Sequence, residues 1–303
     1  MADTQKRRAE NVSGSWFVRE SCINCDAVRQ VAPQLITEVN GKSAFIRQPV
    51  TEEERRLARQ ALLACPVGAI GVTGEKLDVT NLYPEALAPG VSYCGFNSPK
   101  SFGANAFFVQ RAGGGNCLID SPRFAMPLVR QLEALGGLQD IFLTHRDHPA
   151  ESDRYAAHFG ARVWIHQADC DAAPWATHII AGTEPQELVP GLLAIPLPGH
   201  TQGSVSFLLD GMYLFSGDSL YWSRARQDLS AFRRQCWYDW RLQADSLERL
   251  AREHTFTWVL AGHGDRRQLA SEEMHARTLA LSERMRRDDD FWRITTNDLE
   301  VAW

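Results

Sequence analysis

The stretch "LLAIPLPGHTQGS", residues 192–204, decides the fold. It is an apolar run, typical of a buried strand, that ends in Pro-Gly and delivers His200. Two later stretches have the same form: "MYLFSGDSL" delivers Asp218, and "FTWVLAGHGD" delivers His263. The flanking glycines allow the backbone to bend sharply and bring each side chain close to a neighbour. The pattern predicts strand ends that gather imidazole and carboxylate groups.

A fourth stretch, "FLTHRDHPAES", carries His145, Asp147, His148 and Glu151 directly after an apolar run. Alternate positions in an extended loop point the same way, so His145 and Asp147 can reach one ion. A single histidine after a strand is more often an ordinary hydrogen-bonded loop residue than a ligand. Four such strand ends in one chain instead indicate a metal site.

The order of these stretches, Thr-His, Pro-Gly-His-Thr-x-Gly-Ser, Ser-Gly-Asp and Gly-His-Gly, resembles the metallo-β-lactamase superfamily over about residues 96–285. The resemblance implies an α/β protein with a four-layer αββα sandwich, in which two sheets lie between helices. It also implies one or two metal ions at an edge of the sandwich. The metal ligands that it implies are His145, Asp147, His148, His200, Asp218 and His263.

The first motif departs from the superfamily's usual H-x-H-x-D-H, because "THRDHPAES" reads H-x-D-H-x-x-E-S. Asp147 takes the place of the second histidine. In one alignment, similar to ferredoxin-fused members with H-x-D-D-x-x-D-H, His148 replaces an Asp and Glu151-Ser152 replaces the Asp-His. In a second alignment, Asp147-His148 is itself the Asp-His pair after a short deletion. Both alignments stay open, as does a degenerate, noncatalytic site.

The candidate ligands are nitrogen and oxygen donors without cysteine, so zinc, iron and manganese are all acceptable. The carboxylates favour iron or manganese. In the hydrolytic interpretation, bound metal makes hydroxide available at neutral pH and polarises the bond to be cleaved in a small-molecule substrate. Asp147 or Glu151 is the candidate catalytic residue that orients the hydroxide.

The N-terminal segment is predicted to form a separate α+β unit. It contains a strand in "SWFVRE", a hairpin in "LITEVNGKSAFI" about Asn40-Gly41, and a helix in "TEEERRLARQALLAC". Thr51 and Glu54 form a capping-box pair at the start of that helix.

Three cysteines of this unit, Cys22, Cys25 and Cys65 in "CINC…CPVGAI", resemble a bacterial-type ferredoxin, whose cysteines hold a four-iron cluster. Val28 stands at the third ligand position and cannot ligate iron. Three outcomes stay open: a three-iron cluster, a labile four-iron cluster completed by Asp26 or solvent, or a scaffold with no cluster. A redox alternative follows, in which an electron-transfer partner feeds a non-haem di-iron centre, or an oxygenase centre, through this unit. Flavodiiron proteins and some oxygenases are similar in placing iron on this fold with carboxylate-rich ligands.

The predicted boundaries divide the chain into five parts. They are a flexible N-terminus (1–14), a ferredoxin-like domain (15–75), a linker (76–95), a metallo-β-lactamase-like domain (96–285) and a C-terminal tail (286–303). Tryptophans in the tail are candidates to dock on another domain or on a second copy of the chain, which would make a homo-oligomer.

Composition narrows the class of protein. With 303 residues, 44% of them hydrophobic, and nine tryptophans, the chain can bury a sizeable core. A net charge of −5 argues against nucleic-acid binding. The absence of a signal-peptide pattern and of a membrane-length apolar run predicts a soluble, cytoplasmic protein that does not bind membranes. Seven cysteines, an odd number, are expected to be reduced thiols or ligands.

Overall fold

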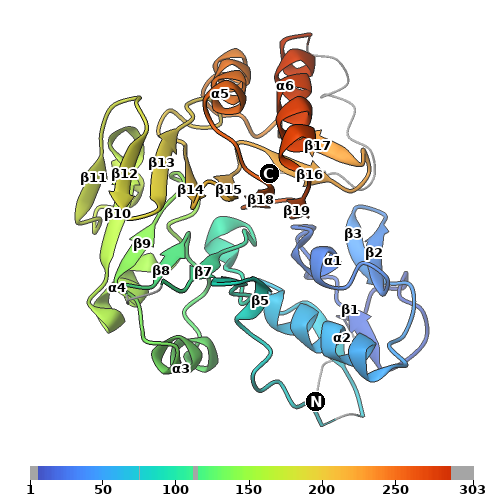
Figure 1. Ribbon diagram of the computed structural model, residues 1–303. Helices are drawn as coiled ribbons and strands as arrows, with labels where there is room; N and C mark the ends of the chain where they lie inside the picture. The colour runs from blue at the N-terminus through green and yellow to red at the C-terminus, as the bar shows by residue number, and fades with distance from the viewer. Residues whose placement is uncertain (1–5, 75, 112–114, 288–303) are drawn as a thin grey trace.

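Two β-sheets form the larger part of the computed structural model, which describes residues 6–74, 76–111 and 115–287 (Figure 1). The first sheet has seven strands, in the spatial order β11 (His178–Ile180), β10 (Arg162–His166), β9 (Asp140–Phe142), β8 (Cys117–Ile119), β7 (Phe107–Val109), β6 (Val91–Tyr93) and β5 (Glu85–Ala88). The second has six, in the order β12 (Gln186–Val189), β13 (Leu192–Pro196), β14 (Val205–Leu209), β15 (Tyr213–Gly217), β18 (Trp258–Ala261) and β19 (Arg267–Gln268).

Aromatic side chains join the facing surfaces of the two sheets. The ring of Phe107 lies 5.4 Å from that of Phe215, and the ring of Phe142 lies 5.4 Å from that of Phe207, measured between centroids. All four side chains are fully buried, or nearly so. Burial of such large rings is the main contribution to holding the sheets together.

Helices cover the outer face of each sheet. Leu208 and Leu214, which alternate with the inward-facing aromatic residues, pack with side chains of α5 (Trp240–Glu253) and α6 (Ser271–Arg287). The helices α3 (Met126–Ala134) and α4 (Ser152–Phe159) lie on the side of the first sheet, away from α5 and α6 (Figure 1). The predicted four-layer αββα sandwich is confirmed.

The N-terminal unit is small and contains the predicted elements. Strand β1 (Trp16–Val18) pairs with β4 (Ile70–Val72), and β2 (Ile36–Val39) pairs with β3 (Lys42–Phe45) through a turn in which Asn40 and Gly41 both have positive φ. The helices are α1 (Ala27–Val31) and α2 (Glu52–Ala64). Both hydrogen bonds of the predicted capping box at the start of α2 are present.

Residues 85–93 correct the predicted linker. They form the hairpin β5–β6, and β6 pairs antiparallel with β7, so this segment is the edge of the first sheet rather than a connection. Its prolines, Pro84 and Pro89, flank the strand β5, where a missing N–H disturbs no central ladder. The linker proper is therefore shorter than the sequence predicts.

The described part of the N-terminus is also more ordered than expected. Arg8 is 2% exposed and donates hydrogen bonds to the carbonyl oxygens of Ser43 (2.7 Å) and Val39 (2.9 Å), so residues 6–14 pack on the N-terminal unit. Residues 1–5 and the predicted tail from 288 onward lie outside the described residues. None of the helices described is both long and apolar enough to cross a bilayer.

Candidate metal centre

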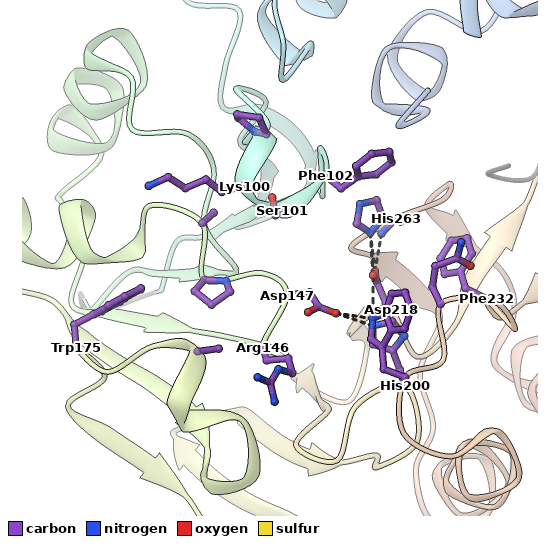
Figure 2. Close-up of a pocket in the computed structure, with 16 residues that line it drawn as sticks. Lys100, Ser101, Phe102, Arg146, Asp147, Trp175, His200, Asp218, Phe232 and His263 are labelled. Atoms are coloured by element: carbon purple, nitrogen blue, oxygen red, sulfur yellow. Dashed lines mark hydrogen bonds and ion pairs between the residues drawn. The ribbon is translucent and has the colours of Figure 1, made fainter. Parts of the chain in front are cut away.

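The loops that follow β9, β13, β15 and β18 meet at one edge of the sandwich. They supply the side chains that we call the ligand cluster: His145, Asp147, His148, His200, Asp218 and His263. Within this cluster Asp147 and His200 point toward one another, and His263 lies beside Asp218 (Figure 2). The four histidines and Asp218 are at most 7% exposed, whereas the side chain of Asp147 is 42% exposed.

Two glycines allow these loops to approach so closely. A Cβ on Gly262 would lie 2.4 Å from Cε1 of His148 and 2.8 Å from Oδ1 of Asp218. Gly217 has φ of +52°, and a Cβ there would lie 2.8 Å from Thr144. The glycines beside Asp218 and His263 in the sequence are therefore required by the packing of the cluster.

The first group of donors surrounds the exposed carboxylate. Oδ2 of Asp147 lies 3.7 Å from Nε2 of His145 and 3.5 Å from Nε2 of His200. Oδ2 of Asp218 lies 3.8 Å and 3.9 Å from the same two nitrogens. Burial raises the pKa of Asp147, but the imidazoles of His200 and His145 outweigh burial and hold it at about 2. Asp147 is therefore ionised and can act as a ligand.

The second group shares Asp218 with the first. Nε2 of His148 lies 3.5 Å from Oδ2 of Asp218, and Nδ1 of His263 lies 2.9 Å from the same oxygen. Because one carboxylate oxygen faces both groups, Asp218 would be shared if the two groups each held an ion.

Unpaired nitrogen atoms test whether these residues fit a metal ion. Nε2 of each of the four histidines is buried and has no hydrogen-bond partner among the described residues. Leaving a buried polar group unpaired costs about 1–3 kcal/mol. The Nε2 atoms of His145, His148 and His200 face the two carboxylates, and cations would satisfy all of these groups together, so the residues present fit one or two transition-metal ions.

Burial and the neighbouring His148 and His200 hold the pKa of His145 well below its ordinary value, so its ring is neutral and its Nε2 lone pair is available. Burial also lowers the pKa of His148, but the carboxylates of Asp218 and Asp120 outweigh burial and raise that pKa to about 10. Ligation by His148 therefore requires release of a proton, and apparent metal affinity at this position rises with pH.

Asp120, at the end of β8, orients two of the histidines. Its Oδ2 lies 2.9 Å from Nδ1 of His148, and its carboxylate accepts hydrogen bonds from the backbone N–H and the hydroxyl of Thr144, each at 2.8 Å. That hydroxyl lies 3.0 Å from Nδ1 of His145. Such partners fix a ring so that Nε2 faces the ligand position. Sequence analysis missed Asp120, although "NCLID" also ends an apolar strand in an acid.

Asp169 joins the two loops that carry the first donor group. It lies in the 3₁₀ helix η3 (Gln167–Ala172) and accepts hydrogen bonds from the hydroxyl of Thr201 (2.6 Å) and the backbone N–H groups of Arg146 (3.0 Å) and Gly203 (3.2 Å). The acids of the ligand cluster were predicted because each follows an apolar strand. Asp169 does not directly follow a strand, so this pattern does not predict its role.

Trp237 holds the exposed carboxylate of the cluster. Its indole N–H donates to Oδ2 of Asp147 at 3.0 Å. The backbone N–H groups of Trp237 and Tyr238 both donate to the carbonyl oxygen of His200, at 2.8 Å and 3.2 Å, which fixes the segment over the His200 loop. The tryptophans and arginines of residues 220–240 were candidates to line a cleft or to form a buried aromatic cluster, and Trp237 lines the cavity.

Glu151 is not part of the ligand cluster, which corrects its assignment as a candidate catalytic residue. Its Oε2 accepts a hydrogen bond from the backbone N–H of Phe124 at 2.8 Å and pairs with Arg154 at 3.2 Å. The adjacent Ser152 accepts the indole N–H of Trp175 at 3.0 Å. The structure thus brings His148, and not Glu151-Ser152, to the other predicted ligands.

A cavity of about 500 Å³ opens onto the cluster. Asp147, His200, Asp218 and His263 line it, together with the cationic side chains of Lys100 and Arg146 and the aromatic rings of Phe102, Trp175, Phe232 and Trp237 (Figure 2).

Comparison with known proteins agrees with this geometry. Residues 88–271 match the family model described as the metallo-beta-lactamase superfamily. The chain belongs to the metallo-β-lactamase superfamily. Residues 18–72 match a second family model, the 4Fe-4S single cluster domain of Ferredoxin I, which agrees with the predicted ferredoxin-like domain. Members of the superfamily bind one or two metal ions, as the ligand cluster requires.

Similar proteins include hydrolases of the superfamily. A hydroxyacylglutathione hydrolase of Fuscovulum blasticum is 36% identical over 121 residues, which are 38% of this chain and 47% of that protein. One from Acidiphilium cryptum (strain JF-5) is 34% identical over 113 residues, 36% of this chain and 46% of that protein. The chain thus spans about half the length of these relatives. The crystal structure of BLEG-1 B3 metallo-beta-lactamase has the same fold, with a TM-score of 0.50 and 21% identity over 62% of this chain and 99% of that one.

The three cysteines of the ferredoxin-like domain lie near one another, since each of Cys22 and Cys65 affects the pKa of Cys25. Cys25 and Cys65 are buried and Cys22 is partly exposed, all three as free thiols. Burial, and then the proximity of Cys65, raises the pKa of Cys25. The backbone N–H of Ala69 donates to Sγ of Cys65 at 3.1 Å, and hydrogen bonds to sulfur of this kind tune iron–sulfur clusters.

Val28 stands at the third ligand position of the ferredoxin pattern and cannot ligate iron. Val28 is buried in α1. Both carboxylate oxygens of Asp26 are already engaged, Oδ1 by Nε of Arg29 at 2.6 Å and Oδ2 by Nε2 of Gln30 at 3.2 Å. Of the outcomes that the sequence left open, completion by Asp26 is therefore the least favoured by the structure.

Proposed function

We propose that the protein is a metal-dependent hydrolase that cleaves an ester or thioester bond of a small-molecule substrate at the ligand cluster. The observation that carries the proposal is the convergence of three buried, unpaired imidazole Nε2 atoms, those of His145, His148 and His200, on Asp147 and Asp218 beside a cavity. When bound, ions at this position supply hydroxide at neutral pH and act as a Lewis acid toward the carbonyl oxygen.

Each residue of the cluster has a defined task in this proposal. His145, Asp147 and His200 hold one ion, which is zinc, iron or manganese. Asp218 is shared with a second ion position that His148 and His263 complete. Asp147 is also the candidate catalytic residue, because its ionised carboxylate borders the cavity and can accept a hydrogen bond from the attacking water.

The cavity lining supports an anionic acyl compound as the substrate class. Lys100 and Arg146 line the cavity, with Arg146 also paired with Asp171 at 2.9 Å, and Trp175 and Trp237 provide flat apolar surfaces. The relatives named hydroxyacylglutathione hydrolase support a thioester as the bond that is cleaved, since glutathione thioesters carry carboxylates that such cations would attract.

His200→Ala is expected to lower the metal content and the hydrolytic activity of the protein together, because it removes a ligand of the first ion. The measurement is elemental analysis of protein purified without added metal, combined with hydrolysis of a hydroxyacylglutathione thioester and a panel of simple esters. His158→Ala is the control, because His158 pairs with Glu133 outside the cluster. Full metal content in His200→Ala, or a wild type that binds no ion, would contradict the proposal.

Trp237→Phe is expected to weaken binding of the first ion by about 10-fold, the lower limit usual for loss of a hydrogen bond to a ligand. The variant keeps an aromatic ring but removes the N–H that holds Asp147. Competition with a chromophoric chelator measures the affinity. Tyr238→Phe is the matched control, because Tyr238 is equally exposed at 52% and its side chain lies outside the cavity lining. Equal affinities of the two variants would argue against an orienting role for Trp237.

A second candidate function is a redox reaction at a non-haem di-iron centre. It is favoured by Asp147, which gives the cluster two carboxylates, and by the position of the cysteines next to a loop that lines the cavity. Two irons per chain with a reducible visible absorption band would support this candidate. A colourless protein with one or two zinc ions would support hydrolysis.

A further inference from the structure

The ferredoxin-like domain reaches the loop that supplies His263 through one buried side chain. Nδ2 of Asn105 donates to Oε1 of Gln30 at 3.0 Å and to the carbonyl oxygen of Ala261 at 3.1 Å. The backbone N–H of Asn105 donates to the carbonyl oxygen of Gly262 at 2.7 Å. Asn105 is 1% exposed, so it connects α1 rigidly to the two residues that precede His263.

A second contact reaches the other side of His263. Arg224, which follows strand β16 (Tyr221–Ser223), donates from Nε to Oδ2 of Asp265 at 2.9 Å and forms a further short contact with Oδ1 of Asp265. The same guanidinium lies 3.6 Å from Oδ2 of Asp26, which directly follows Cys25. Arg224 therefore pairs an acid of the cysteine loop with an acid two residues after His263.

A third contact joins the cysteine site to the cavity. A Cβ on Gly103 would lie 2.8 Å from Sγ of Cys25, so Gly103 is packed directly against that thiol. The ring of the preceding Phe102 lies 6.3 Å from the ring of His263 and lines the cavity beside it (Figure 2). One short loop thus contacts Cys25 and His263.

We propose that the ferredoxin-like domain is a structural part of the metal centre, with Gln30, Asn105 and Arg224 as positioning residues for His263. The inference rests on the ion-binding part of the proposed function. The ring of His263 is held on one side by its hydrogen bond to Asp218, which is itself a proposed ligand. The remaining control over the position of Nε2 of His263 comes from the backbone of residues 261–265. The residues that follow Cys25 fix that backbone from both sides. The fused domain then serves the catalytic site directly, whether or not electrons pass between the two.

The test is a titration of metal-free, full-length protein with Co²⁺, followed by its visible spectrum and stoichiometry. Gln30→Met removes the acceptor for Asn105 and keeps the side-chain length. We expect it to weaken the second Co²⁺ by about tenfold and to alter the spectrum of that ion, while the first ion binds as in wild type. In an Asn105→Ala background, Gln30→Met should have no further effect, because Gln30 acts through Asn105.

Glu85→Gln is the matched control. It breaks another ion pair between the two domains, Arg56 with Glu85 at 3.6 Å, which does not involve the His263 loop. Its Co²⁺ affinities should equal those of wild type. The inference is overturned if Gln30→Met binds the second Co²⁺ as tightly as wild type does. It is also overturned if Gln30→Met and Glu85→Gln both lose affinity for the two ions to the same extent. The proposed function stands if the wild-type protein binds two Co²⁺ ions, whatever the variants show. If the wild-type protein binds none, the proposed function and this inference both fail.

Discussion

Asp218→Ala is expected to abolish binding of both ions and the hydrolysis that depends on them. One oxygen of Asp218 lies 3.5–3.9 Å from Nε2 of His145, His148 and His200 and 2.9 Å from Nδ1 of His263. Loss of an outer partner alone costs about 10–100-fold in metal affinity, so loss of this shared ligand should exceed about 100-fold. Elemental analysis and equilibrium dialysis against Zn²⁺ measure the effect.

The same substitution should destabilise the metal-free protein. With a pKa of about 10, His148 carries a proton at neutral pH, and Asp218 is one of the two carboxylates that balance its charge. Removing one partner of a buried pair costs about 3–5 kcal/mol, measured as a lower free energy of unfolding in urea. His263→Ala is the comparison, since it should lose one ion and keep the other. Two tightly bound ions in Asp218→Ala would show that the carboxylate is not shared.

Asp120→Ala is expected to lower metal affinity by about 10–100-fold although Asp120 is not a ligand. The substitution would leave Nδ1 of His148 and the N–H of Thr144 without their partner. The ring of His148, and the ring of His145 that contacts Thr144, would then be free to turn away from the cluster. In the metal-free protein the buried charge of His148 would also lose its other carboxylate, at a cost of about 3–5 kcal/mol. Isothermal titration with Zn²⁺ and urea unfolding measure the two effects.

Asp140→Ala separates loss of orientation from loss of a buried acid. Asp140 is fully buried at the opposite end of β9 from His145 and accepts hydrogen bonds from Arg162 (2.8 Å) and Trp164 (2.7 Å). The Asp140→Ala variant should have a lower free energy of unfolding than wild type, while its affinity for Zn²⁺ should equal that of wild type. If Asp120→Ala also kept wild-type affinity, the orientation of His148 by Asp120 would have no functional importance.

Local sequence pattern predicted which loops carry the ligand cluster because each loop follows an apolar strand, but it left open whether His148 or Glu151 belongs to the cluster. The ends of β13, β15 and β18 are marked by glycine next to a histidine or aspartate, and both signals lie within a few residues. The capping box of α2 and the Asn40-Gly41 hairpin were predictable for the same reason.

Residues whose role depends on contacts far along the chain were not predictable in this way. The hydrogen bond of Trp237 to Asp147 joins positions 90 residues apart, and nothing local to Trp237 signals it. Glu151 has a suitable spacing from His145, but α4 begins at Ser152 and the carboxylate turns to the N–H of Phe124. Spacing alone does not show the direction of a side chain in an irregular loop.

The hairpin β5–β6 determines where the two domains can be separated. A chain begun at residue 96, the start that the sequence resemblance implies, would lack both strands and leave the backbone N–H and C=O groups of β7 uncovered along the sheet edge. Uncovered edges of this kind pair with other copies and promote aggregation. A truncated protein that keeps the metallo-β-lactamase-like domain intact must therefore begin before Glu85, in the short segment between the ferredoxin-like domain and the first sheet.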